Sequence, residues 1–191
     1  MQVVGVHESA RYTSHVLMAT DDSYVDGYRR LAKTVHSHGA AVVAQVFHPG
    51  REIMESQDGS APVALAPSAV PTERFHVMPQ AMTTSLVEEI VAGYGEAARR
   101  LHSAGLDGVE VVASHGYLPA QFLNPTTNLR TDRYGGDAEQ RLTFLRDVIA
   151  GIRSVVGADF IVGLRISADE MSEGGLRVDD TVGLPDRKLP G

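Results

Sequence analysis

The sequence predicts an α/β fold of the (β/α)₈ TIM-barrel type, with about half of the barrel present. Short apolar runs alternate along the chain with segments of helical periodicity. The runs are apolar almost throughout, which is typical of parallel strands covered on both faces. No Gly-x-Gly-x-x-Gly turn follows any run, so a dinucleotide-binding doubly wound sheet is the less favoured alternative.

The expected order of elements is β-α-β-α-β-α-β. The strands are predicted at residues 2–6 (QVVGV), 40–47 (AAVVAQVF), 108–114 (GVEVVAS) and 160–167 (FIVGLRIS). Connections from strand to helix are long and polar, whereas those from helix to strand are short. This asymmetry is typical of folds that carry their function at the carboxyl ends of parallel strands. Polar residues at those ends are therefore the candidate functional residues.

Three helices are predicted between the strands from apolar residues at helical spacing, each with a glycine beyond its end. They cover residues 25–35, 86–101 and 142–152, and the glycines are Gly39, Gly105 and Gly157. Ser85 and Glu88 have the spacing of a capping box for the second helix, and Asp137 is the expected cap of the third. Gly93 and Gly95 fall inside the second helix, where close packing is the expected reason for them.

The predicted domain covers residues 2–184, and an irregular tail follows at 185–191, where Pro185 and Pro190 stop any helix. A complete barrel has eight strands and roughly 250 residues, whereas this chain has 191. We therefore expect a partial barrel, from a truncated gene product or a fragment. Its unpaired edge strands would promote association, including homo-oligomers.

Composition and charge argue against several classes of function. The net charge of −7 and the absence of a basic cluster argue against a nucleic-acid or anionic-membrane surface. Without cysteine, the chain itself can form no disulfide, thiolate zinc site or iron–sulfur cluster. No apolar run approaches the roughly 20 residues of a membrane span, and no signal peptide is recognisable. We expect a cytoplasmic protein whose partner is a small molecule.

Hydrogen-bonding side chains follow or end three of the predicted strands. They are Gln45, His115, Tyr117 and Arg165. The carboxyl ends of parallel strands meet at one edge of the sheet, so a shared site is expected there. Neutral and cationic donors with a phenol suit a planar, electron-rich heterocycle that becomes negatively charged during turnover. A flavin fits that description.

Two other chemistries are weaker alternatives. His48 and His115 could bind a metal on neighbouring strands, but no carboxylate at a strand end completes the site. Glu110 lies within its strand, where a barrel-interior or buried salt-bridge position is expected. Ser114 is a poor nucleophile candidate beside His115, because adjacent strand residues point to opposite faces and no Gly-x-Ser-x-Gly turn is present.

Four blocks of sequence resemble the Old Yellow Enzyme-like flavin oxidoreductases, the broad group that includes bacterial 2,4-dienoyl-CoA reductases and trimethylamine dehydrogenase. The blocks are VVAQVFHPGR (42–51), HGYLPAQFLNPTTNLRTDRYGG (115–136), EQRLTFLRDVIAGIR (139–153) and VGLRIS (162–167). With VVGVHES near the start, the resemblance extends over about residues 2–180. The four strands then resemble the family's second to fifth, and the LPAQFLNP sequence favours the dienoyl-CoA-reductase-like branch.

The resemblance implies FMN at the carboxyl-end face of the barrel and hydride transfer between NAD(P)H and an unsaturated carbonyl or similar acceptor. Gln45 would bind the pyrimidine edge of the flavin, and Arg165 would lie near N1 and the C2 carbonyl. Gly5 would let the backbone approach the ring. His115 would donate to the acceptor carbonyl, and Tyr117 would supply a proton to the alkene carbon. The alternative is an inactive, truncated half-barrel that acts only as an association module or is a non-functional fragment.

Two further implications concern the surroundings of the site. Many relatives have a histidine three residues before the position of His115, where this chain has Val112. The segment 121–136 resembles an ordered loop whose residues 130–134 brace the entrance, although solvated charge is the simpler expectation for Arg130 and Arg133. His48 and Arg51 are expected to fix the loop after the second predicted strand.

Overall fold

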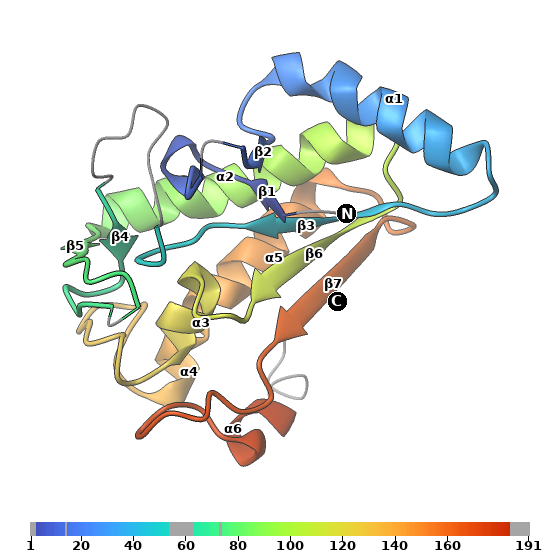
Figure 1. The fold of residues 1–191 in the computed structure, drawn as a ribbon. Helices are drawn as coiled ribbons and strands as arrows, with labels where there is room; N and C mark the ends of the chain where they lie inside the picture. The colour runs from blue at the N-terminus through green and yellow to red at the C-terminus, as the bar shows by residue number, and fades with distance from the viewer. Residues whose placement is uncertain (1–2, 14, 54–62, 73, 184–191) are drawn as a thin grey trace.

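The fold is built on a five-stranded parallel sheet (Figure 1). The computed structural model describes residues 3–13, 15–53, 63–72 and 74–183. The strand order is β2 (Leu17–Met18), β1 (Val3–Gly5), β3 (Val43–Phe47), β6 (Gly108–Ala113) and β7 (Ile161–Ile166). All four predicted strands are therefore present, each shorter than expected at one or both ends.

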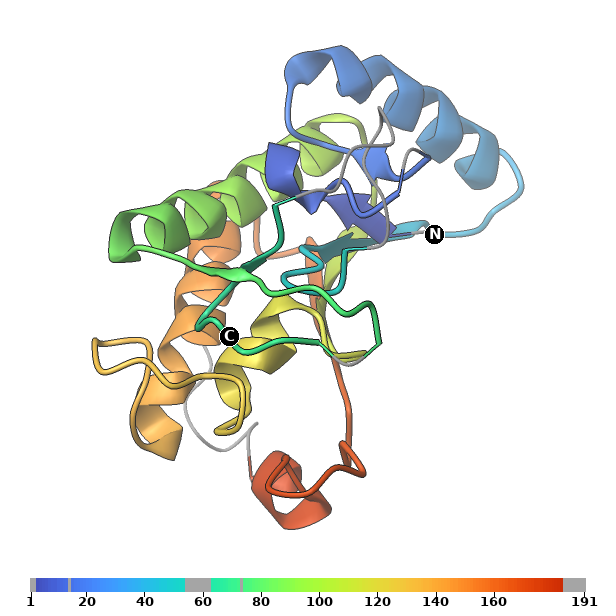
Figure 2. The ribbon, with the colours of Figure 1, turned by 60° about the vertical axis from the view of Figure 1, so that its left-hand side comes forward.

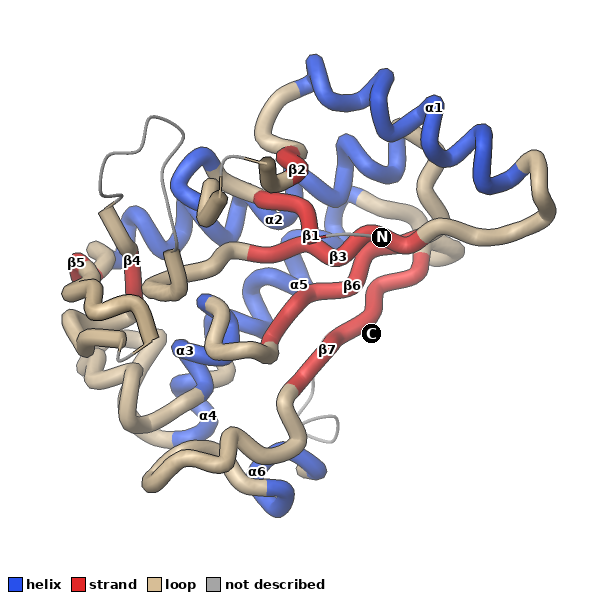
Figure 3. Tube along the Cα trace, in the orientation of Figure 1, coloured by secondary structure: helices blue, strands red, loops and turns tan. Residues whose placement is uncertain are grey.

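Three short strands were not expected from the sequence. β2 pairs in parallel with β1, and β4 (Leu65–Ala66) pairs in parallel with β5 (Gln80–Ala81) away from the main sheet (Figure 3). Each has only two residues. A period of two residues cannot be recognised over so short a segment, so these pairings come from tertiary contacts alone.

Helices cover one face of the sheet (Figure 1). They are α1 (Val25–His36), α2 (Thr84–Ser103) and α5 (Thr143–Val155). Their apolar sides pack onto alternate strand residues, among them Ala44, Val46, Val109 and Val111, in one buried core. The intervening residues of the same strands point to the opposite face, because side chains alternate along a strand. That opposite face carries the candidate site.

The structure tests the two helix caps and the close packing at Gly93 that the sequence predicts. α2 is capped by Thr83, whose hydroxyl accepts the backbone N–H of Leu86 over 3.2 Å, so the cap predicted at Ser85 is wrong. Asp137 forms a capping box with Gln140 at α4 (Ala138–Arg141), which leads into α5. A Cβ on Gly93 would lie 2.7 Å from the carbonyl oxygen of Val6, which explains the glycine by close packing.

Two short helices follow the carboxyl ends of β6 and β7. α3 (Leu118–Leu123) was not expected from the sequence and overlaps the start of the expected ordered loop at 121–136, and α6 (Val178–Val182) lies apart from the main helical layer (Figure 2). The predicted tail at 185–191 lies outside the described residues. Over the described part of the chain, no helix has the length and apolarity that a membrane crossing requires.

Candidate active site

The strand register places the predicted cofactor-binding residues on one face of the sheet. Gln45 lies opposite Glu110 across β3 and β6, and Arg165 lies opposite Val112 across β6 and β7. Residues opposite each other in neighbouring strands point to the same face, and so do residues two apart in one strand. Gln45, Glu110, Val112 and Arg165 therefore share the face away from the main helices.

Glu110 joins the two predicted flavin-binding side chains. Its Oε1 accepts the Nε2–H of Gln45 over 2.7 Å and the Nε–H of Arg165 over 2.7 Å. Its Oε2 lies 3.4 Å from Nη2 of Arg165. With Val43, these residues line a cavity of about 260 Å³. We call these three residues the Gln45–Glu110–Arg165 array. Glu110 was expected either inside the barrel or in a buried salt bridge, and it forms an ion pair with Arg165 on the face away from the main helices.

The Glu110 carboxyl is held in its ionised form. Burial raises its pKa, but hydrogen bonds from Gln45 and Arg165 outweigh that effect and leave the pKa below its usual value. An ionised carboxylate accepts hydrogen bonds and cannot donate them. The amide nitrogen of Gln45 must therefore face Glu110, which leaves its oxygen available as an acceptor.

His115 lies in a turn beyond the end of β6 rather than in the strand. Its φ of 61° and the φ of 72° at Gly116 place two successive residues in the left-handed region. This turn brings Nδ1 of His115 within 2.7 Å of the Ser114 hydroxyl. The expectation that these adjacent side chains point in opposite directions is wrong, because β6 ends at Ala113.

Tyr117 lies next to His115, with 5.8 Å between their ring centroids. It also packs against Phe47, at 5.2 Å between centroids, beside an apolar cluster that contains Val112. Burial is the main cause of a raised pKa for the Tyr117 phenol, which keeps it protonated. The structure thus brings the two predicted catalytic residues together, with a fully apolar side chain at position 112.

A cavity of about 300 Å³ adjoins His115. It is lined from the loops after β3, β6 and β7 and from α3, with Arg51, Gln121, Asn124 and Glu170 among the lining residues. Burial raises the pKa of the Glu170 carboxyl, which accepts the side-chain amide of Asn124 over 2.6 Å. The cavity is at the carboxyl ends of the strands, where the barrel fold places ligands.

Gly5 lies opposite Phe47 across β1 and β3, on the same face as Gln45, but Met18 fills the space beside it. A Cβ at this position would lie 2.6 Å from the sulfur of Met18 and 3.2 Å from Cβ of Ala10. The space that the glycine leaves is filled by β2 and the short helical turn at Glu8–Ala10. Its predicted role beside the flavin ring stays a prediction.

The loop-fixing roles expected for His48 and Arg51 are confirmed. His48 is fully buried; its Nδ1 accepts the backbone N–H of Gly50 over 3.0 Å, and its Nε2 lies 2.9 Å from the Ser9 hydroxyl. Arg51 donates to the backbone carbonyls of Val70 and Pro71. Both ring nitrogens of His48 are therefore engaged. Burial lowers its pKa to about 3, so the ring is neutral.

The metal alternative gains no support from the geometry. With both ring nitrogens of His48 already in hydrogen bonds, only His115 of the two proposed ligands is available. Among the residues that the structure describes, no group of three or more histidine or acidic side chains is placed to hold an ion.

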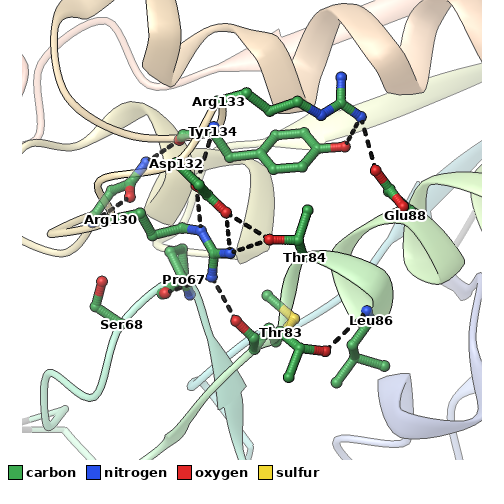
Figure 4. Close-up of polar contacts among 12 residues, drawn as sticks. Pro67, Ser68, Thr83, Thr84, Leu86, Glu88, Arg130, Asp132, Arg133 and Tyr134 are labelled. Carbon is green, nitrogen blue, oxygen red and sulfur yellow. Dashed lines mark hydrogen bonds and ion pairs between the residues drawn. The ribbon is translucent and has the colours of Figure 1, made fainter.

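The segment beyond α3 is anchored by Arg130 (Figure 4). Its guanidinium donates to the backbone carbonyls of Pro67 and Met82 and pairs with Asp132. The side chain of Arg130 is only 10% exposed, so the expectation of a solvated charge is wrong there, whereas Arg133 is 51% exposed. Arg130 thus ties the segment to β4, β5 and the start of α2.

Comparison with known proteins identifies the family. The chain matches the NADH:flavin oxidoreductase / NADH oxidase family over residues 2–185. It is 43% identical over 154 residues to a metal reductase of Desulforamulus reducens, an alignment that covers 81% of this chain and 23% of that protein. It is 35% identical over 182 residues to an NADPH dehydrogenase of Listeria monocytogenes, covering 95% of this chain and 52% of the relative.

Solved structures give the same assignment. A complex of 2-naphthoyl-CoA reductase superposes with a TM-score of 0.88 at 29% identity, covering 96% of this chain and 30% of that one. Morphinone reductase in complex with tetrahydroNAD superposes with a TM-score of 0.79 at 30% identity, covering 92% and 52%. This chain therefore spans between about a quarter and about half of these relatives, and its parallel α/β sheet is part of a TIM barrel. It belongs to the NADH:flavin oxidoreductase / NADH oxidase family.

Proposed function

We propose that this chain supplies the flavin-facing part of an FMN-dependent oxidoreductase that transfers hydride between NAD(P)H and an unsaturated carbonyl or similar small-molecule acceptor. The observation that carries the proposal is the Gln45–Glu110–Arg165 array. Glu110 fixes an acceptor oxygen on Gln45, and Arg165 carries N–H donors beside it. The pyrimidine edge of a flavin offers an N–H group flanked by carbonyl oxygens, which complements this pattern.

The positive charge of Arg165 also suits the negative charge that a flavin acquires on reduction. The side chain of Arg165 is 50% exposed, and its only ion pair among the described residues is with Glu110. A cation in this position favours a ligand that becomes anionic on reduction. FMN, when bound, supplies the hydride-transferring group, and this chain's residues would orient its ring. Gly5 contributes to that role only if Met18 moves away from it.

His115 and Tyr117 form the proposed acceptor side of the site. His115 is exposed, lines the 300 Å³ cavity and can donate a hydrogen bond to a carbonyl oxygen. The protonated phenol of Tyr117 lies beside it and can deliver a proton to the substrate carbon. Val112 contributes no second donor, so carbonyl polarisation rests on His115.

The test is flavin uptake followed by reduction. The purified chain, incubated with FMN and desalted, should keep flavin absorbance that bleaches under anaerobic conditions with NADPH or NADH. Gln45→Leu and Arg165→Leu should weaken FMN binding, whereas Tyr117→Phe should leave flavin reduction unchanged and slow reoxidation by an enone. A folded, colourless chain that takes up no FMN would overturn the proposal.

A second candidate function is association of an inactive half-barrel through its open sheet edge. The observation that favours it is β7, which pairs only with β6 among the described strands and leaves Ile161 52% exposed. An unpaired edge strand offers its backbone groups to another chain. Size-exclusion chromatography should then show oligomers without flavin, and a compact FMN-bound monomer would rule this function out.

A further inference from the structure

We propose that Glu110 is a positioning residue that sets how strongly the candidate site favours reduced over oxidised flavin, by partly neutralising Arg165. The inference rests on the proposed function. The strand pattern alone predicts only that Glu110 lies in the interior or in a salt bridge. The inference gives its carboxylate a role. Glu110 would act through its two partners, without touching the reacting atoms.

The geometry makes Glu110 the junction of three neighbouring strands. Its Oε1 accepts hydrogen bonds from Gln45 on β3 and Arg165 on β7, both over 2.7 Å. The Glu110 side chain is 25% exposed, so its charge is partly shielded from water. An ion pair at this distance reduces the positive potential that Arg165 presents to a ligand.

The two partners respond differently to loss of the charge. Gln45 is neutral, and its bond to the ligand would be similar for both redox states. Arg165 is cationic, and its attraction is stronger for the anionic reduced form. Removing the Glu110 charge should therefore change the ratio between the affinities for reduced and oxidised FMN. Loosening Gln45 should instead weaken binding of both forms by a similar factor. The ratio separates an electrostatic role from a purely structural one.

The test measures the midpoint potential of FMN bound to the chain, relative to free FMN, by anaerobic dye-equilibrated reduction. Glu110→Gln should raise the preference for the reduced form about tenfold, which is about 30 mV for a two-electron couple. Glu110→Asp, which keeps the charge, should stay within about twofold of the unmodified chain. Glu88→Gln removes a carboxylate that pairs with Arg133 on the exposed side of α2, and it should change nothing.

The outcomes separate the inference from the function on which it rests. If Glu110→Gln binds FMN with an unchanged potential, the charge-setting role is wrong and the proposed function stands. If the unmodified chain takes up no FMN, both fail together. If Glu110→Gln does not fold, Glu110→Thr provides a second neutral variant with a β-branched side chain suited to a strand. The same rise in potential is expected from it.

Discussion

Two regions of the site are held in place by different physical means. The Gln45–Glu110–Arg165 array sits on strands whose backbone register sets which side chains are neighbours. The segment from His115 to Gly136 has one short helix, and buried polar side chains fix it by bonding to backbone carbonyls. Asn128, for example, is 4% exposed and donates to the carbonyls of Phe122 and Tyr134, both over 2.7 Å.

The difference shows how each region fails when it is altered. The array depends on the pairing of β3, β6 and β7, so substitutions that push these strands apart should separate its three side chains. The segment depends on individual hydrogen bonds, so single polar substitutions should loosen it and leave the sheet intact. Four substitution sets test this contrast, and they are ordered from the largest expected effect to the smallest.

Gly108→Ala should destabilise the fold by about 3 kcal/mol, because overpacking a filled interior forces the neighbouring backbone to move. A Cβ at this position would lie 2.5 Å from Cβ of Ile161 and 2.6 Å from its carbonyl oxygen. Urea unfolding measures the change. Gly27→Ala in α1 is the control, since its added Cβ meets no heavy atom within 4 Å apart from its chain neighbours and its own helix backbone. Equal stability of the two variants would contradict the close approach of β6 and β7.

Asn128→Ala should cost about 2 kcal/mol, because two buried carbonyls lose their donor. Leu129→Ala next to it is the matched control, since Leu129 is 62% exposed and its loss should cost less than about 0.5 kcal/mol. Unfolding free energies and proteolysis of the segment compare the two. A loss in Asn128→Ala no larger than in Leu129→Ala would show that the hydrogen bonds of Asn128 do not stabilise the segment.

Asp132 should make stability depend on acid pH. The hydrogen bonds from Arg130 are the main cause of its lowered pKa, which falls from 3.8 to about 2. A carboxyl whose pKa is lower in the folded state stabilises the fold above pH 3.8, and that contribution disappears as the pH falls towards 2. The carboxyl is partly exposed, so about 1 kcal/mol is expected after allowance for solvent screening.

Asp132→Asn is the comparison for that pH dependence. Its unfolding free energy between pH 5 and pH 2 should fall less steeply than that of the unmodified chain. Parallel curves for the two proteins would show that the Arg130 pair does not anchor the segment energetically.

Of all these substitutions, His115→Asn should have the smallest effect on stability. Asn tolerates the left-handed region, so His115→Asn should change the unfolding free energy by less than about 0.5 kcal/mol. A β-branched residue is strained there, and His115→Val should cost about 1 kcal/mol more. Thermal unfolding distinguishes the two variants. If Val is tolerated as well as Asn, the turn at His115 and Gly116 does not hold the backbone as the structure has it.

The sequence by itself determined the four predicted strands, the three helices between them and the candidate polar residues within and after those strands. Burial repeats with a fixed period along each element, and strand ends are recognisable from the residues that follow them. Gln45, Arg165, His115 and Tyr117 could therefore be named as candidate site residues before any contact was known. The resemblance to the family depends on the same local blocks.

Only the tertiary structure decided how those residues are joined. The bond between Gln45 and Glu110 spans 65 positions, and that between Arg130 and Pro67 spans 63. The left-handed backbone at His115 and the packing of Met18 against Gly5 are equally invisible to a periodic pattern. Local propensity specifies which face of an element is buried, whereas hydrogen-bond partners depend on how separate elements pack, and that is settled when the whole sheet is assembled.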